Sequence, residues 1–373
     1  MNQLVTQPPA MLAGRVLAYV DEAHCSAAVT ATGSHPASGL VVAKPSGIGL
    51  TRQLRSAGYG APIVVDVRSW ADRFASVDAP TDLADDSGLL PAITLDEWAD
   101  PVLRAGATAV LTPSRFVRAG DWPALKAVLN AGEEASLPTI VTLVATDAAM
   151  LDPQYFATFV QLTSARRQPV GFVFASNQPP FNRRGRAAAL RALTKAVPGS
   201  MLLGVDALVG LDAPVHGAHM SAIGITGGQR RPRRPGDNGG GGNARDWVPG
   251  LFLRDLWEQR SPSTYADWYA NSRSPVCAAC GGRALDSFGN SDDEKHAVLS
   301  HNVHAWLGVL TEMRQVADTE RAGWLAEQRL GGFEAHAMLR PAGVRMEADL
   351  VLRQLVELDD PGRRRTTPDG AWL

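Results

Sequence analysis

The stretch PTIVTLVA, residues 138–145, is the longest of the apolar runs that decide the fold. It is rich in β-branched residues and lacks strict polar–apolar alternation, which is typical of a strand buried on both faces of a parallel sheet. Similar runs recur through the first 226 residues: VLAYV (16–20), GLVVA (39–43), PIVVD (62–66), ATAVLT (107–112), PVGFVFA (169–175), MLLGVD (201–206) and MSAIGIT (220–226). With PTIVTLVA they predict eight buried strands.

Helical patterns fill most of the gaps between these runs. DWPALKAVLNAGEEA (121–135) begins at a predicted N-cap, Asp121, and RGRAAALRALTKAV (184–197) ends before Pro198 and Gly199. Alternation of strand and helix predicts right-handed βαβ units, and eight of them predict an α/β fold closed into a (β/α)8 barrel. The alternative is an open, doubly wound sheet, which is disfavoured because no GxGxxG motif follows the first run.

The character of the sequence changes after residue 226. Residues 227–246 form an Arg/Gly-rich loop without core-forming residues, which we assign to a barrel domain spanning 1–246. Residues 247–358 are rich in aromatic, Cys and His residues and continue into long amphipathic patterns, which predicts a zinc-binding helical subdomain. Residues 359–373 are expected to be a disordered tail.

The composition narrows the classes of function. A 373-residue chain that is 45% hydrophobic and 20% charged can bury a sizeable core. Its net charge of −2 gives no general attraction to nucleic acid, so a basic surface must be local. Three cysteines argue against a disulfide framework and for a reducing compartment. No signal peptide or apolar run of roughly 20 residues is present, so we expect a cytoplasmic protein without membrane contact.

The stretch CAACGGRALDSFGNSDDEKHAVLSHNVH, residues 277–304, carries metal-ligand spacing. Cys277 and Cys280 lie on a CxxC turn, and His296 and His301 follow, so the four side chains can close a tetrahedron around a structural Zn²⁺. The spacing of His296 and His301 predicts a helix start between them, and His304 is the alternative fourth ligand. A redox CxxC is disfavoured by the following GGR, and core cysteines with surface histidines are the remaining alternative.

The segment SHNVHAWLGVLTEMRQ (300–315), with CxxC upstream, resembles the zinc subdomain of the tRNA-guanine transglycosylase superfamily. Cys277, Cys280 and His301 match the second and third cysteines and the histidine of that family's C-x-C-x-x-C…H pattern. The first cysteine falls at Pro275, so either His296 replaces it or the site is degenerate. The resemblance implies a (β/α)8 barrel with the zinc subdomain after strand eight, and a homodimer or partner subunit.

The resemblance also implies a base-exchange site at the C-terminal ends of the strands. Asp66 ends the third run, where the family has an Asp used in exchange. The family's nucleophilic Asp ends strand eight, where this chain has MSAIGITGG, so Asp206 at the end of run seven becomes the candidate nucleophile. The alternative role of Asp206 is to cap a helix. Asn177 and Gln178 follow run six, where amides can read a purine edge. Candidate nucleic-acid contacts are Arg230, Arg231, Arg233 and Arg234.

The resemblance thus implies a pentosyltransferase that exchanges guanine in tRNA or DNA for a free purine or 7-deazapurine base through a glycosyl-enzyme. The alternative is a non-catalytic, zinc-stabilised barrel that binds nucleic acid or a catalytic partner subunit. A third is an unrelated barrel enzyme with a zinc-bearing C-terminal region. Base exchange requires Asp206 to face the cavity opposite Asp66, whereas a helix-capping Asp206 favours the binding role.

Overall fold

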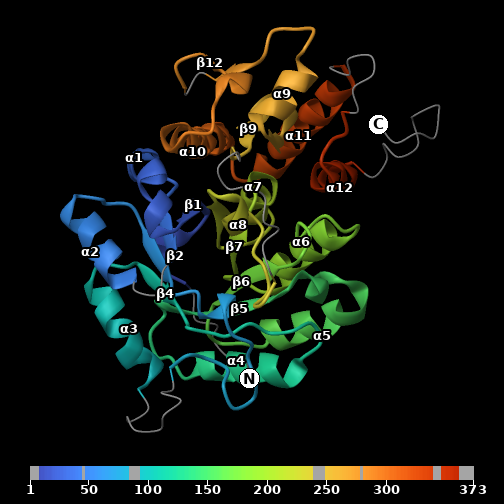
Figure 1. Cartoon of the computed structure of the whole chain (residues 1–373). Helices are drawn as coiled ribbons and strands as arrows, with labels where there is room; N and C mark the ends of the chain where they lie inside the picture. Colours follow the sequence, from blue (N-terminus) through green and yellow to red (C-terminus); the bar gives the residue numbers. More distant parts are fainter. Residues whose placement is uncertain are drawn as a thin grey trace. The chain divides into compact units, whose positions relative to one another are not determined.

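The eight apolar runs form eight parallel strands that close into a barrel in the order β1 to β8 (Figure 1). The computed structural model describes residues 8–43, 47–83, 93–237, 248–277, 280–338 and 346–360. The strands are β1 (Arg15–Val20), β2 (Leu40–Ala43), β3 (Ile63–Asp66), β4 (Ala109–Leu111), β5 (Ile140–Asp147), β6 (Val170–Ala175), β7 (Met201–Val205) and β8 (Met220–Gly224). Ala18 of β1 pairs with Leu40 of β2 and with Ile223 of β8, which closes the barrel. The predicted (β/α)8 architecture is thus confirmed.

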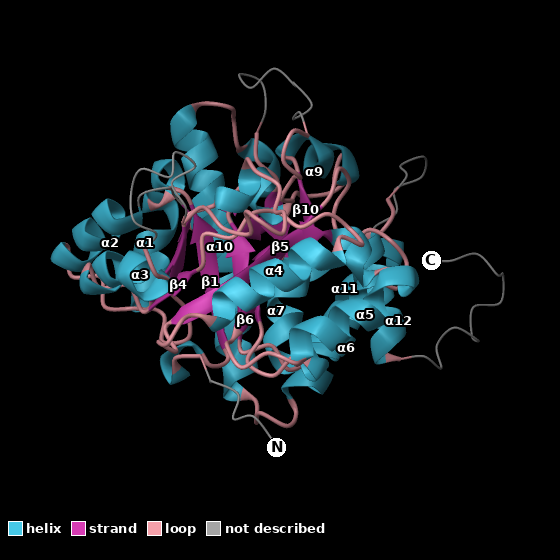
Figure 2. Ribbon diagram, turned by 90° about the horizontal axis from the view of Figure 1, so that it is seen from below, coloured by secondary structure: helices cyan, strands magenta, loops and turns pink. Residues whose placement is uncertain are grey.

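A helix follows each strand, and in Figure 2 the helices lie outside the strands of the barrel. They are α1 (Ser26–Ser34), α2 (Gly47–Ser56), α3 (Leu95–Arg104), α4 (Trp122–Glu133), α5 (Pro153–Ser164), α6 (Arg186–Ala196), α7 (Ala207–Val215) and the four-residue α8 (Gly227–Arg230). The predicted N-cap is confirmed, because the Asp121 side chain accepts a hydrogen bond from the Ala124 N–H. Gly132 lets α4 approach β5 closely, since a Cβ there would stand 2.0 Å from Thr142 Oγ1.

The interior of the barrel is a packed core. The buried side chains that fill it include Leu17, Val41, Val64, Leu111, Val141, Leu143, Val173, Leu203 and Ala222. All residues of β2 to β8 are buried, because the strands face other side chains inside the barrel and helices outside it. This explains why near-continuous apolar runs, rather than alternating ones, encode these strands.

The chain divides into two compact units, Met1–Phe181 with Ala189–Asn238, and Asn182–Ala188 with Gly239–Leu373. The domain boundary predicted after residue 246 falls within 238–247, outside the described residues. The predicted tail is described only at Asp359, where the last helix ends, and at Asp360. None of the helices in the described part of the chain combines the length and the apolar character needed to cross a membrane.

The second unit is built from two small antiparallel sheets and long helices. Its elements are β9 (Leu251–Leu253), β10 (Glu258–Arg260), α9 (Pro262–Trp268), β11 (Val276–Cys277), β12 (Arg283–Ala284), α10 (Asp292–Gln315), α11 (Arg321–Met338) and α12 (Leu350–Asp359). The aromatic side chains predicted in this region serve the core: Tyr265 and Trp268 are buried beside Leu251 and Val298. Trp257 is 2% exposed and packs edge-on against Phe252.

The Arg/Gly-rich segment differs from its prediction. Thr226 caps α8 with a capping box to Gln229, and the side chain of Gln229 is buried. Pro232 is also buried, and its carbonyl accepts a hydrogen bond from the Ser176 N–H at 3.0 Å. The expectation of a loop without core-forming residues is therefore wrong for 227–237. Single-sequence patterns miss such a segment because its partners come from the loop after β6.

Candidate functional site

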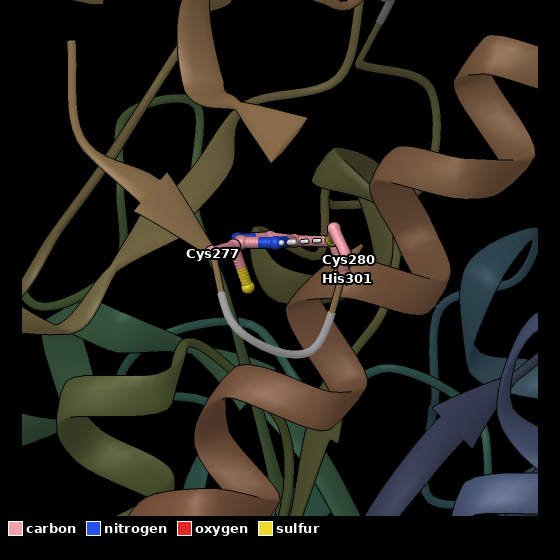
Figure 3. A group of neighbouring side chains, drawn as sticks. All are labelled: Cys277, Cys280 and His301. Carbon is pink, nitrogen blue, oxygen red and sulfur yellow. Dashed lines mark hydrogen bonds between the residues drawn. The ribbon is translucent and has the colours of Figure 1, made fainter. Parts of the chain in front are cut away.

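The second unit brings together two thiols and one imidazole that can hold a metal ion. The Sγ atoms of Cys277 and Cys280 and a ring nitrogen of His301 all lie within 4.8 Å of one another. Figure 3 shows the side chains of Cys277, Cys280 and His301; Cys277 ends strand β11, Cys280 lies between β11 and β12, and His301 lies on helix α10. In a tetrahedral Zn²⁺ site, neighbouring ligand atoms stand roughly 3.3–3.8 Å apart, so small side-chain movements suffice to bind the ion.

A tight hairpin positions the two cysteines. Val276 and Cys277 of β11 pair with Arg283 and Ala284 of β12, and the Gly282 N–H donates to the Cys277 carbonyl at 2.9 Å. Gly281 and Gly282 have φ angles of +67° and +82°. Residues with a Cβ rarely adopt these angles, so the GG after CxxC is what allows the chain to turn back. A CxxCGG sequence therefore brings both thiols to one side of the turn.

A hydrogen bond to the backbone fixes the orientation of His301. Its Nε2 lies 3.0 Å from the carbonyl oxygen of Phe252, and its Nδ1 lies 3.1 Å from Cys280 Sγ. A carbonyl only accepts, so Nε2 carries a proton, and Nδ1 is the ring nitrogen directed at the thiols. Metal-binding histidines commonly donate their second ring N–H to a carbonyl in this way. Asn302 completes the arrangement, because its Oδ1 accepts from the Phe252 N–H at 2.7 Å.

The two thiols have different acidities. Burial opposes ionisation of Cys277, but the hydrogen bond and charge of His301 outweigh it and lower the pKa of Cys277 to about 7. Burial and the neighbouring charge of Cys277 raise the pKa of Cys280 to about 12. Two thiolates this close repel each other, so a divalent cation is what allows both to be charged at neutral pH.

The structure does not bring the predicted fourth ligand into this group. His296 is exposed on α10, and His304 is exposed with its Nδ1 2.9 Å from the Ser300 carbonyl. The predicted helix start between His296 and His301 is also wrong, because α10 begins at Asp292. With 3.6 residues per turn, side chains five apart point about 140° away from each other. His301 therefore faces the thiols while His296 does not.

Asp66, the predicted exchange residue, is sealed inside the first unit. Its Oδ2 accepts from Tyr19 Oη at 2.6 Å and from Trp70 Nε1 at 3.2 Å, and its Oδ1 accepts from the Arg68 N–H at 2.8 Å. Asp66 is 0% exposed. Burial raises the pKa of this carboxyl, although the three hydrogen bonds act against the shift. The carboxyl joins the ends of β1 and β3.

Asp206, the predicted nucleophile, caps the helix that follows its strand. Its Oδ1 accepts from the Val209 N–H at 3.0 Å, which satisfies one donor of the first turn of α7. Strand β8 ends at Gly224, and Ile225 and Thr226 follow without an acidic side chain. The helix-capping alternative for Asp206 is therefore the one observed.

The predicted nucleic-acid contacts come together in part. Arg234 Nε donates to Asn177 Oδ1 at 3.0 Å and also to Asp237, while its Nη1 contacts Asp147 at 3.0 Å. Arg230 instead points back to the end of β8, donating to the Ile225 carbonyl at 2.8 Å, and burial lowers its pKa to about 10. Four predicted contacts are exposed, namely Asn177, Gln178, Arg231 and Arg233.

The sequence matches no model of a known protein family and no curated protein. Membership of the transglycosylase superfamily therefore stays a prediction that rests on the barrel layout and on Cys277, Cys280 and His301.

Sequence reasoning missed several residues that shape these sites. The Oδ1 of Asn302 accepts from the Phe252 N–H, and its Nδ2 donates to the Gly250 carbonyl at 2.8 Å. Its position directly after His301 was a signal, since an Asn buried in a helix requires polar partners. Asp147 ends β5 in the way that Asp66 ends β3, so the strand-end rule that singled out Asp66 also applied to it.

Proposed function

We propose that this chain is a zinc-stabilised (β/α)8 barrel that binds nucleic acid without itself exchanging bases. The observation that carries the proposal is the attachment of the arginine segment to the loop after β6. The Ser176–Pro232 and Asn177–Arg234 hydrogen bonds join the segment that carries exposed Arg231 and Arg233 to the loop that carries the exposed amides. Cationic and amide side chains on one end of the barrel suit phosphate and base-edge contacts.

The non-catalytic part of the proposal follows from the burial and hydrogen bonding of Asp66 and Asp206. Exchange requires two carboxyl groups that are accessible to one sugar. Asp66 is buried with three donors, and Asp206 caps α7. The segment after β8 supplies no replacement among Ile225, Thr226 and Gly227. The structural roles of Asp66 and Asp206 favour binding over covalent catalysis.

Charge sets the expected strength of binding. Asp147 and Asp237 pair with Arg234, and the side chains of Arg231 and Arg233 are exposed. Two phosphate contacts give a slope of log K against log salt of roughly −1.5 to −2. We therefore expect modest, salt-sensitive affinity rather than the tight binding of a strongly basic protein.

Zinc is the metal that best fits the Cys/His group. Two thiolates and an imidazole are soft and borderline ligands, which select Zn²⁺ over Mg²⁺ or Ca²⁺. Cys277 and Cys280 pack against the aromatic core of the second unit, so an ion there would link hairpin β11–β12 to α10. This supports a structural role for the metal.

Fluorescence anisotropy with labelled tRNA, single-stranded DNA and duplex DNA over a salt series tests the proposal. We expect the double variant Arg231→Gln/Arg233→Gln to weaken binding and to reduce the salt slope by about 2. Arg52→Gln, which removes an exposed arginine on α2, is the matched control and should leave the slope unchanged. Equal binding by the double variant would reject the arginine segment as the nucleic-acid site, and no binding by the wild type would reject nucleic acid and leave the partner-subunit role.

A second assay separates binding from chemistry. The wild-type protein is incubated with tRNA or duplex DNA and with labelled guanine or a 7-deazaguanine. We expect no incorporation into either polymer. Incorporation that Asp66→Ala and Asp206→Ala abolish would overturn the non-catalytic proposal and establish base exchange, with the nucleophile on the loop after β7.

A further inference from the structure

The turn after β3 holds one arginine in an unusual backbone conformation. Asp66 Oδ1 accepts the Arg68 N–H, and the Ala71 N–H donates to the Arg68 carbonyl at 2.9 Å, which starts a short 3-10 helix at Ser69–Ala71. Trp70 then returns to Asp66 through its Nε1. Arg68 lies in the left-handed region, with φ 60° and ψ 25°. The segment DVRSW is thus a closed turn around one carboxyl group.

A left-handed backbone is costly for a residue with a Cβ, and it persists where other contacts enforce it. In the described residues, the non-glycine positions with positive φ are Arg68 and Trp257. Trp257 is 2% exposed and packs into the core of its unit, which offsets the cost. Packing offsets less of the cost of the left-handed backbone at Arg68, because Arg68 is only partly buried. Strained, partly exposed residues of this kind are characteristic of ligand sites.

The guanidinium of Arg68 has an unsatisfied donor. Its Cζ stands 5.3 Å from the ring centroid of Trp70, which holds the group by a cation–π contact. Its Nε is buried and has no hydrogen-bond partner within the described part of the chain. Among the described residues, Arg68 also forms no ion pair with Asp66. A buried charged donor without an acceptor is unfavourable, so such atoms commonly mark a ligand or ion position.

The surroundings favour an anion at this position. Arg68 is near enough to Asp66 and Tyr19 to act against the rise in the pKa of both groups. Burial raises the pKa of Asp66, and both of its carboxyl oxygens already accept hydrogen bonds from the chain itself. Asp21, which forms an ion pair with His24 at 2.7 Å, is the other acid that acts on Tyr19. Ligands of (β/α)8 barrels bind at this end of the strands.

We propose that Arg68 binds an oxyanion, the carboxylate or phosphate group of a ligand, at the C-terminal end of β3. The planar guanidinium presents Nε–H and Nη–H donors in a fork that matches two oxygens of such a group. The strained turn holds the fork in place before the ligand arrives. This site is independent of Arg231 and Arg233, so it stands or falls separately from the nucleic-acid proposal.

Thermal unfolding and calorimetry with inorganic phosphate and acetate, at ionic strength matched with sodium chloride, test the site. We expect saturable stabilisation of the wild type by at least one of the two anions. Arg68→Gln should weaken this binding by about tenfold or more, as loss of one charge-assisted hydrogen bond predicts. Arg52→Gln is the control and should bind as the wild type does. The absence of saturable binding by the wild type, or equal binding by Arg68→Gln, would overturn the proposal.

Arg68→Gly separates a ligand-binding arginine from a merely structural one. Glycine adopts the left-handed conformation freely, so this variant should melt at a higher temperature than the wild type without anion and gain nothing from phosphate. A lower melting temperature would mean that Arg68 serves mainly to cover Trp70, against the proposal. Because glycine accepts the backbone conformation of residue 68, a loss of anion binding by this variant is attributable to the missing guanidinium.

The source of the oxyanion is resolved by competition. A tetrathymidylate with and without a 5′-phosphate is titrated against phosphate-loaded protein. Displacement by both oligonucleotides through Arg68 identifies a backbone phosphate, and displacement only by the 5′-phosphorylated one identifies a phosphate monoester. Displacement by neither, with phosphate or acetate still binding through Arg68, identifies a small free ligand.

Discussion

The strand-end acids of the barrel and the Cys/His group of the second unit are polar clusters of opposite kinds. Asp66, Asp147 and Asp206 are each satisfied by donors of the chain itself. Cys277, Cys280 and His301 instead direct their ligand atoms at one another. A carboxylate whose oxygens all accept hydrogen bonds from the chain acts as a structural element. Two thiols that face an imidazole nitrogen instead require a cation if both are to ionise. Proximity to a strand end alone therefore does not identify an active site.

Loss of the metal should have the largest effect. Cys280→Ser or a chelator should remove bound zinc and lower the free energy of unfolding by about 4 kcal/mol, the linkage expected when metal exceeds its Kd about 1,000-fold. Elemental analysis and thermal unfolding with and without chelator measure this. Cys25→Ala is the control, since Cys25 is buried in the first unit and should leave the metal content unchanged. Metal-free wild-type protein with a Cys277–Cys280 disulfide would reverse the comparison and make the pair a redox site.

Asp66→Asn should have the next largest effect. The amide nitrogen of Asn replaces one carboxyl oxygen and so faces a donor, either Trp70 Nε1 or the Arg68 N–H. An unsatisfied buried donor costs about 2 kcal/mol of unfolding free energy. Denaturant unfolding measures the change. An unchanged stability would show that Asp66 is not the structural element that its contacts indicate.

The same variant gives a pH test. Because the folded-state pKa of Asp66 is raised, its contribution to stability is complete below the unfolded pKa, near 3.8, and is lost as pH rises through the folded pKa. The stability advantage of the wild type over Asp66→Asn should therefore shrink as pH rises from about 4. Paired unfolding curves from pH 4 to 8 show this. An advantage that grows with pH would mean that the three hydrogen bonds, and not burial, dominate.

Asp206 should give the smallest effect. Asp206→Ala removes an N-cap and should cost about 1 kcal/mol, whereas Asp206→Asn keeps a good cap and should change stability by less than about 0.5 kcal/mol. Chemical unfolding of both variants tests this. If Asn and Ala cost the same, the charge of Asp206 has a role beyond capping, and the contrast with the Cys/His group weakens.

The barrel was predictable because its signal is local. Each strand is buried on both faces, so its own residues must be apolar, and eight such runs stand out without knowledge of their neighbours. The Cys277 and Cys280 spacing was equally local. Whether His296 joins His301 as a ligand could not be read in this way, because it depends on where α10 begins, and Ser291 caps that helix earlier than the sequence indicated.

The sequence by itself determined which segments are strands, that they close in order, and that two thiols stand on one turn. Only the tertiary structure decided which polar side chains are buried and hydrogen-bonded within the protein and which are available to a ligand. Tyr19 reaches Asp66 across 47 residues, and His301 reaches Phe252 across 49. The physical reason is that hydrogen bonding and burial depend on partners distant in the chain, whereas strand propensity and turn geometry depend on neighbours.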